Sequence, residues 1–358
     1  MRIAYSCAGE GLGHATRMAV IGPLLQRSHD IFYFIPETVK GFVSSRIGKV
    51  SHEEIPHFSF IKRGERVCLI LTVLRAVPLA LAFPFVLLGL VRRLRNLLIE
   101  AVISDFDPFL AWAAWMAGIP VLQINHPGIV QRVSSIHPQA ILTSMATRML
   151  EGPWDERIHL SFYGGDVGPI IRPEIFSRPI SDGGFVLLNL KHCLREAILP
   201  ILDRMGIRYR LFPDPQEDFI GALASCSCVL STAGHQIIAE SIALNKPILV
   251  IPQAGQWEQQ LNARMVDQTG KGHSTTVDRL EGDLPKFLGS LERYRSHVLS
   301  SLFNVADSSR EIVLRIEDFL GKVRQEKYGR LLFAVGSPAH QDGARLGEPQ
   351  GCDKKRAV

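Results

Sequence analysis

Short apolar runs alternate with helical patterns along both halves of the sequence, and this alternation restricts the possible folds more than any other feature. The apolar runs lie at 2–6, 30–36, 100–105, 119–125, 184–190, 208–212, 228–233 and 247–253. Apolar residues at helical spacing follow most of them, as at Leu194, Ile198 and Leu202. Strands that alternate with helices predict parallel sheets, and strands this uniformly apolar are typical of sheets covered on both faces. The chain is therefore expected to be an α/β protein with doubly wound sheets.

The length of the chain and its irregular segments predict two domains. A chain of 358 residues is long enough for two domains of about 150–200 residues each. Residues 1–166 are expected to form the first domain and residues 184–325 the second. The segment 167–183 is rich in glycine and proline and is expected to be a linker. Residues 336–358 contain few large apolar side chains and are expected to form a disordered tail.

Charge and cysteine content narrow the class of protein. The net charge of +5 is too small to indicate a nucleic-acid partner, and none is expected. The six cysteines form no C-x-x-C pair and are expected to be reduced thiols. The first apolar run is too short for a signal peptide. We therefore expect a cytoplasmic protein.

One segment inside the first domain is unusually apolar. Residues 67–91 contain a single charge, Arg75, and Pro78 and Pro84 are expected to interrupt any helix. The uncharged part would be about 24 Å long as a helix, shorter than a hydrocarbon core of about 30 Å. Basic residues flank the segment up to residue 95, which favours a cytoplasmic position for both ends. The segment is a buried helix, a surface at 67–95 that docks on a membrane or a lipid substrate, or a membrane span.

A glycine-rich turn follows the first apolar run, and a histidine lies at its end. From Cys7 to Arg17 the sequence reads CAGEGLGHATR. An imidazole has an ordinary pKa near 6.5, so His14 is able to accept a proton at neutral pH. Asp105 ends another apolar run of the same predicted sheet. It is expected either to hold the imidazole in one tautomer or to cap the helix that follows.

A second glycine-containing turn lies more than two hundred residues later. From Ser231 to Ala263 the sequence reads STAGHQIIAESIALNKPILVIPQAGQWEQQLNA. A helix is expected to begin at His235, and its first N–H groups, which lack partners within the helix, are expected to bind a diphosphate. Glu240 lies one to two turns further, where its carboxylate can accept hydrogen bonds from a ribose diol. Polar side chains follow the next apolar run: Gln256, Glu258, Gln259 and Gln260.

These motifs resemble those of the GT-B glycosyltransferases, in particular the branch of the peptidoglycan N-acetylglucosaminyltransferase, which acts on an undecaprenyl-linked acceptor. The pattern G-x-x-x-x-A-E-S-x-A-x-x-K-P-x-L-x-I-P…E-Q-Q-x-x-N-A is similar to the donor signature of that branch, and G-E-G-L-G-H is similar to its N-terminal glycine loop. VISDFDPF and GIPVLQINH also resemble uncharacterised bacterial and archaeal glycosyltransferase-like proteins. The resemblance extends to about residue 325. It implies the GT-B fold, in which two Rossmann-like domains face a cleft, the first binding the acceptor and the second a UDP-sugar donor.

The resemblance also implies roles for individual residues. His14 matches a histidine at the catalytic lip, with Asp105 as its expected partner. The residues expected to bind the donor are Gly11, Gly13, Thr232, Gly234, His235, Glu240, Gln256, Gln259 and Gln260. Among these, Glu240 matches the residue that binds the ribose, and the glutamine pair matches the residues that read the sugar hydroxyls. Candidates on the acceptor side are Glu10, Arg17 and His126. For Arg17, exposure to solvent is the favoured alternative.

The sequence thus predicts an inverting glycosyltransferase that moves a sugar, such as an N-acetylhexosamine, from a UDP-sugar to an acceptor hydroxyl. His14 would be the base, and the helix beginning at His235 would stabilise the departing diphosphate. No essential metal ion and no cofactor are expected. The apolar segment favours a lipid-linked acceptor at the cytoplasmic face of the plasma membrane. Two alternatives are a nucleotide-sugar 2-epimerase, which shares the fold and the donor pocket, and a non-catalytic subunit that binds the UDP-sugar.

Overall fold

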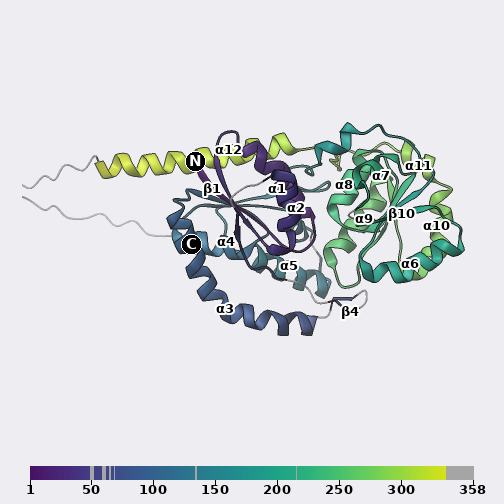
Figure 1. Ribbon diagram of the computed structural model, residues 1–358, viewed down its shortest axis with the longest axis horizontal. Helices are drawn as coiled ribbons and strands as arrows, with labels where there is room; N and C mark the ends of the chain where they lie inside the picture. Colours follow the sequence, from purple (N-terminus) through teal and green to yellow (C-terminus); the bar gives the residue numbers. More distant parts are fainter. Residues whose placement is uncertain are drawn as a thin grey trace, which may run out of the picture.

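The protein consists of two α/β domains, which lie at the left and right of Figure 1. The computed structural model describes residues 1–48, 52–58, 62–63, 66–67, 69–133, 135–214 and 216–335. The expected tail at 336–358 lies outside the described residues.

The first domain contains a parallel sheet with a doubly wound strand order. Its strands are β1 (Arg2–Cys7), β2 (Asp30–Ile35), β3 (His52–Glu54), β6 (Ala101–Asp105), β7 (Val121–Asn125) and β8 (Glu156–His159). Its helices are α1 (Gly13–Leu25), α2 (Glu37–Ile47), α3 (Leu69–Asn96), α4 (Pro108–Ala117), η1 (Pro127–Gln131) and α5 (Pro138–Glu151), and β4 (Lys62–Arg63) pairs with β5 (Arg66–Val67). The strand order β3-β2-β1-β6-β7-β8 reverses between β1 and β6, and ligands of such sheets bind beyond the carboxyl ends of the strands at this point. Cys7 and Asp105 are paired there.

The second domain repeats this architecture with five strands. Its strands are β9 (Val186–Asn189), β10 (Tyr209–Phe212), β11 (Cys228–Thr232), β12 (Ile248–Ile251) and β13 (Gly272–Ser274). Its helices are η2 (Pro173–Ser177), α6 (His192–Arg204), α7 (Phe219–Ser225), α8 (His235–Ala243), α9 (Trp257–Thr269), η3 (Val277–Arg279), α10 (Leu280–Leu288) and α11 (Leu291–Ser296). The parallel order β10-β9-β11-β12-β13 reverses between β9 and β11, so the turns after these two strands are the expected ligand site of this sheet. The doubly wound sheets predicted from the sequence are confirmed in both halves.

The apolar segment of the first domain forms most of helix α3, which projects below the domain in Figure 1. The expected interruption at Pro78 and Pro84 is wrong, because the helix continues through both residues. Buried side chains on one face pack with those of α4: Leu87, Leu90, Val91 and Leu94. The opposite face exposes Val77, Leu81, Phe85 and Leu88. By length and composition alone, Val77–Asn96 is also apolar enough to cross a membrane.

The chain passes between the domains twice, and the two passages are hydrogen-bonded to each other. The Asn304 N–H donates to the Phe162 carbonyl at 2.9 Å, and the Ser308 N–H donates to the Pro169 carbonyl at 3.0 Å. Helix α12 (Ser309–Val335) then runs back along the first domain, at the top of Figure 1. Its apolar side chains join the core of that domain, namely Ile312, Ile316, Phe319 and Leu320. Part of the range expected for the second domain, residues 309–325, therefore packs on the first.

Candidate functional site

The two glycine-containing turns meet at the boundary between the domains. A Cβ atom on Gly13, the first residue of α1, would lie 4.0 Å from Cβ of Gln236 in the first turn of α8. Both helices begin where the strand order of their sheet reverses, so each sheet presents its expected ligand site to the other. Gly11 has φ of +79°, a backbone conformation that glycine adopts without strain. The two glycine-containing turns, which the sequence predicts to form one site, therefore lie next to each other.

His14, Arg17 and Asp105 form a closely spaced cluster at the end of β1 and β6. His14 Nδ1 lies 2.7 Å from Asp105 Oδ1. Arg17 donates from Nε to Asp105 Oδ2 and from Nη2 to Asp105 Oδ1, both at 2.7 Å. Arg17 Nη2 also lies 2.8 Å from His14 Nδ1. The Asp105 carboxylate is the only charged acceptor in the cluster, so we assign a proton to His14 Nδ1 and direct it at this carboxylate. This tautomer leaves Nε2 of His14 as the unprotonated nitrogen.

Burial and charge compete at this cluster. Burial alone would raise the pKa of Asp105, but Arg17 and His14 more than offset it and keep that pKa below its ordinary value. Burial opposes the charge of Arg17 as well, and Asp105 more than compensates, so the pKa of Arg17 is raised. The expectation that Arg17 faces solvent is wrong, because its side chain is 4% exposed and is bound to Asp105. Its charge compensates the carboxylate that would otherwise be unpaired in the core.

Asp107, and not Asp105, caps the helix that follows β6. Its carboxylate accepts from the N–H groups of Phe109 and Leu110 at 3.1 and 3.0 Å. Burial raises the pKa of Asp107 to about 6. The sequence letters from Asp105 to Asp107 have D-x-D spacing, but each carboxylate has its own partners: Arg17 and His14 for the first, and the start of α4 for the second. Among the residues that the structure describes, no group of three or more His, Cys, Asp or Glu side chains is placed to hold a metal ion.

The N-terminus of α8 carries a buried histidine in a fixed tautomer. Gly234 is the N-cap and provides no side-chain cap. His235 Nε2 accepts from the Phe162 N–H at 3.2 Å, so the proton lies on Nδ1, which has no partner among the described residues. The His235 ring stacks on that of His126, with centroids 3.8 Å apart. The first N–H groups of α8, which lack partners within the helix, form a set of donors beside the buried Thr232.

Two neutral histidines thus lie in contact at the domain boundary. Burial lowers the pKa of His126 to about 3, with a further contribution from Arg17. Burial and the neighbouring His126 ring place the pKa of His235 well below its ordinary value. His126 Nδ1 lies 3.1 Å from the Leu160 carbonyl, and its Nε2 lies 3.1 Å from Asn262 Oδ1. His126 was expected on the acceptor side, and the structure places it between the two domains.

Asn262 is a site residue that the sequence reasoning did not single out. It is fully buried, donates from Nδ2 to the Ala233 carbonyl at 3.1 Å, and accepts the Tyr163 hydroxyl at 2.7 Å. It therefore joins the turn before α8 to both His126 and the passage between the domains. The signal was present in the motif E-Q-Q-x-x-N-A, whose asparagine lies one helical turn after Glu258.

Arg172 is the second site residue that the sequence did not reveal, and it binds Glu240. Arg172 donates from Nε to Glu240 Oε1 at 2.7 Å and from Nη2 to Oε2 at 2.5 Å. Gln236 Nε2 donates to Oε1 at 2.8 Å. Glu240 is 0% exposed, and Arg172 also lies over the Phe219 ring, 5.0 Å from its centroid. Arg172 belongs to the segment expected to be a linker. It lies between apolar residues and a proline, and this position was the sequence feature that could have indicated a buried arginine.

The polar residues after β12 form a local amide network. Gln259 Oε1 accepts from the Gln253 N–H at 3.0 Å, and its Nε2 donates to the side chains of Gln253 and Gln256. Lys191 donates to Gln253 Oε1 at 3.2 Å. Gln260 is half-buried. Burial raises the pKa of Glu258, while His14 and Arg17 act in the opposite direction. Glu258 therefore faces the cluster of His14, Arg17 and Asp105 from the second domain.

Most of the chain is similar to known glycosyltransferases. The model of a family described as glycosyl transferase family 1 matches residues 1–291. An uncharacterised glycosyltransferase of Methanosarcina acetivorans is 26% identical over 386 aligned positions, which cover 90% of this chain and 99% of the relative. The UDP-N-acetylglucosamine–N-acetylmuramyl-(pentapeptide) pyrophosphoryl-undecaprenol N-acetylglucosamine transferase of Clostridioides difficile is 29% identical over 150 positions, 38% of this chain and 37% of the relative.

Solved structures agree with this fold. MurG of Acinetobacter baumannii superimposes with a TM-score of 0.56 and 13% identity, covering 88% of this chain and 99% of that structure. The UDP-GlcNAc 2-epimerase of Neisseria meningitidis has a TM-score of 0.57 and 12% identity, with coverage of 89% and 100%. Identities this low show only that the fold is shared. They do not distinguish a glycosyltransferase from an epimerase. The family match covers most of the chain, and the protein belongs to glycosyl transferase family 1 as a glycosyltransferase of the GT-B fold.

Proposed function

We propose that the protein is an inverting glycosyltransferase that moves a sugar from a UDP-sugar to an acceptor hydroxyl bound by the first domain. The observation that carries this proposal is the position of His14 and its Asp105–Arg17 partners near the N-terminus of α8, where a Cβ atom on Gly13 would lie 4.0 Å from that of Gln236. A base on one domain and a set of diphosphate donors on the other are the two parts that a single displacement requires.

The roles follow from the positions of the groups. His14 Nε2 takes the acceptor proton, while Asp105 fixes the ring through Nδ1 and stabilises the imidazolium that forms. The α8 N–H groups from His235 onward bind the leaving diphosphate, whose negative charge grows as the bond breaks. Attack from the side opposite the diphosphate inverts the anomeric centre.

The remaining donor contacts belong to the same proposal. Gly11 and Gly13 allow the donor to approach the first domain, Thr232 lies at the end of β11, and Gln256, Gln259 and Gln260 read the sugar hydroxyls. Arg172 already bonds both oxygens of Glu240. Gln236 also donates to Oε1. A carboxylate oxygen has about two acceptor positions, so one position on Oε2 is left for a ribose hydroxyl. We also predict that the donor sugar is an N-acetylhexosamine and that the reaction requires no metal ion.

The acceptor is proposed to be borne by a lipid at the cytoplasmic face of the plasma membrane. The exposed apolar stripe of α3 ends beside Arg92, Arg93 and Arg95, all exposed. An amphipathic surface of apolar and cationic side chains binds an anionic bilayer surface. The name of the Clostridioides difficile relative also includes pyrophosphoryl-undecaprenol, a lipid-linked acceptor. Peripheral attachment accords with the packing of the other α3 face in the core.

The test combines ligand stabilisation with product detection. UDP-N-acetylglucosamine at about 100 times its dissociation constant should stabilise the protein by about 2.7 kcal/mol. Release of UDP that depends on an acceptor supports transfer. Conversion of the sugar to its 2-epimer would instead identify the epimerase alternative, and stabilisation without either product would identify a binding subunit. Stabilisation by NAD or ATP but by no UDP compound would contradict the donor assignment.

A further inference from the structure

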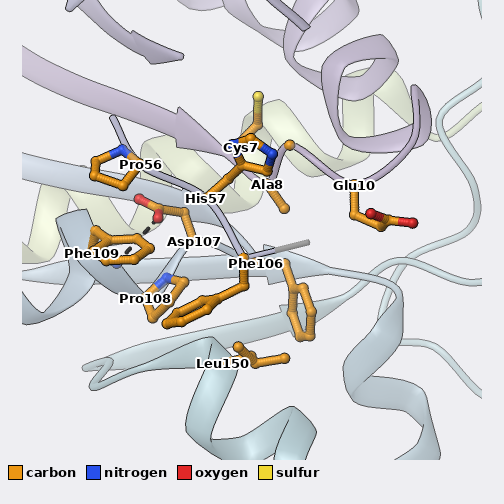
Figure 2. A pocket seen from close by; sticks show the side chains of 12 residues that line it. Cys7, Ala8, Glu10, Pro56, His57, Phe106, Asp107, Pro108, Phe109 and Leu150 are labelled. Atoms are coloured by element: carbon orange, nitrogen blue, oxygen red, sulfur yellow. Dashed lines mark hydrogen bonds between the residues drawn. The ribbon is translucent and has the colours of Figure 1, made fainter. Parts of the chain in front are cut away.

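The cavity beside the glycine-rich turn is too small to hold the nucleoside of a donor. Glu10, His57 and Phe109 are among the residues that line it (Figure 2). Its volume of about 40 Å³ has room for only a few water molecules. Glu240 of α8, the residue matched to ribose binding, is therefore the main candidate for a nucleoside contact. The partners of its carboxylate determine which ribose groups it is able to bind.

Most of the acceptor positions on Glu240 are already filled by protein groups. Oε1 accepts from Arg172 Nε at 2.7 Å and from Gln236 Nε2 at 2.8 Å. Oε2 accepts from Arg172 Nη2 at 2.5 Å. A carboxylate has about four acceptor positions, two on each oxygen. At most one position is therefore left for a ligand, whereas a carboxylate that binds both hydroxyls of a ribose diol needs two.

Burial restricts access to the remaining position. Glu240 is 0% exposed, and the side chain of Arg172 is 12% exposed. A ligand that approaches the pair would therefore meet the guanidinium before the carboxylate. The guanidinium presents Nε and Nη2 to Glu240, and its Cζ lies 5.0 Å from the centroid of the Phe219 ring. Arg172 is thus fixed by two different contacts and covers Glu240.

The charges of the pair favour this closed arrangement. Burial opposes the charge of Arg172, but Glu240 more than compensates, so the pKa of Arg172 is raised. Gln236 lies one helical turn before Glu240 and also donates to the Ile170 carbonyl at 2.9 Å. A ribose that displaced the guanidinium would leave a buried carboxylate with one neutral amide as its partner. Removal of a buried charge's partner is strongly unfavourable, so we expect the pair to persist when a nucleotide binds.

We infer that Arg172 makes donor recognition insensitive to the ribose 2′-hydroxyl, so that the site accepts 2′-deoxynucleoside diphosphate sugars as well as UDP-sugars. The inference rests on the proposed function and specifies the nucleotide of its donor. A site whose carboxylate binds both ribose hydroxyls loses a charge-assisted hydrogen bond when one hydroxyl is absent. Here Glu240 offers at most one position, and the 3′-hydroxyl, which both classes of nucleotide carry, is sufficient to fill it.

Two nucleotides that differ by one hydroxyl test the inference. UDP and 2′-deoxy-UDP are each titrated into the full-length protein in a calorimeter. We expect their dissociation constants to agree within about threefold, because no hydrogen bond to a charged group is lost. A stronger preference for UDP would overturn the inference and leave the donor assignment intact. Failure of both nucleotides to bind would be a different result, because it would contradict the proposed function itself.

Replacement of Arg172 by lysine tests whether this residue sets the specificity. Arg172→Lys keeps the positive charge, but a single ammonium replaces the two parallel donors of the guanidinium. An acceptor position on Glu240 becomes free, so both ribose hydroxyls gain a partner. We expect the preference for UDP over 2′-deoxy-UDP to rise to about tenfold or more, as for one hydrogen bond to a charged group. Arg204→Lys, in the exposed pair of Arg204 and Glu281, is the matched control and should leave the ratio unchanged.

A second variant frees an acceptor position without changing a charged residue. Gln236→Met removes the amide that donates to Oε1 and keeps a side chain of similar length, so the preference for UDP should rise here as well. Gln268→Met, at an exposed position of α9, is the control. The ratio compares two ligands on the same protein, so a general loss of affinity cancels. An unchanged ratio in both Arg172→Lys and Gln236→Met would show that the partners of Glu240 do not set the specificity, and would overturn the inference.

Discussion

Arg17 donates to both oxygens of Asp105 from within the core, and the same carboxylate contacts Nδ1 of His14. One residue thus neutralises the carboxylate and also restricts the position of the imidazole. Since Arg17 lies one helical turn after His14 in α1, the three groups are held by a single helix and a single strand end. The cluster is consequently rigid where a base must be aligned with its substrate.

Removal of the Arg17 charge is expected to destabilise the fold strongly. Arg17→Met leaves the buried Asp105 carboxylate without its guanidinium partner and with only His14 beside it, and breaking a buried pair in this way costs about 3–5 kcal/mol. Urea unfolding at neutral pH measures the loss. The double variant Arg17→Met with Asp105→Asn should recover part of it, since no unpaired charge remains. A loss below about 1 kcal/mol, typical of an exposed pair, would contradict the burial of this interaction.

Replacement of His14 is expected to affect turnover and not donor binding. His14→Gln keeps a polar side chain but removes the base, so kcat should fall by about 10²–10⁴-fold. Thermal stabilisation by the UDP-sugar should remain, because the diphosphate donors lie on α8. Acceptor-dependent UDP release measures the first quantity. Full activity in a correctly folded His14→Gln protein would remove the proposed base.

The stacked pair His126 and His235 predicts a loss of stability in mild acid. Their native pKa values lie below the ordinary value, about 3 for His126. Below about pH 6.5 the unfolded chain binds protons that the folded protein excludes. The free energy of unfolding should therefore fall by up to about 1.4 kcal/mol per pH unit for each ring.

The slope of stability against pH tests this assignment between pH 6.5 and 5. His235→Gln should reduce the slope, because one excluded proton is gone. His137→Gln, which changes an exposed ring, should leave it unchanged. Equal slopes in the unmodified protein and both variants would show that the stacked pair does not cause the loss of stability in acid.

The Arg172–Glu240 pair is expected to support donor binding. Arg172→Met leaves Glu240 buried without its main partner, so the start of α8 should rearrange. We expect UDP to bind about tenfold more weakly, equivalent to about 1.4 kcal/mol, as measured by calorimetric titration. The exposed pair of Arg204 and Glu281 offers a control, since Glu281→Gln should change UDP affinity little. Unaltered affinity in Arg172→Met would separate Glu240 from the donor site.

The outer stripe of α3 is expected to mediate membrane attachment. Leu81 and Phe85 are 72% and 77% exposed on this stripe, whereas Leu87 is buried in the core. An informative variant therefore changes Leu81 and Phe85 to serine. Burial of one large apolar side chain contributes about 1.5–3 kcal/mol, so co-sedimentation with anionic liposomes should fall by about tenfold or more. Leu314→Ser, at a similarly exposed position on α12, is the control. Unchanged sedimentation of the α3 variant would contradict attachment through this stripe.

Strand positions and the pairing of His14 with Asp105 were accessible from the sequence. Apolar runs identify buried parallel strands, and residues that follow neighbouring strands meet at one edge of a sheet. The same reasoning placed the α8 N-terminus, because a turn after a strand begins that helix. These features depend on local pattern and on rules of topology.

The partners of buried charges were not accessible in the same way. Arg172 reaches Glu240 from a segment without a periodic pattern, and nothing in spacing reveals which distant residue such a segment will contact. Arg17 looks like an exposed basic residue until the depth of Asp105 is known. The apolar pattern of α12 likewise indicates that it packs, but not on which of two cores. These contacts depend on tertiary packing between segments that are far apart in the sequence.

The paired passages of the chain at Phe162–Asn304 and Pro169–Ser308 limit how the domains can separate. Two covalent connections, tied to each other by backbone hydrogen bonds, act as a hinge whose axis runs close to both. Opening would then be a rotation about that axis, and the distance between His14 and Gly234 would be its natural reporter. A sliding motion would have to break the bonds between the passages first.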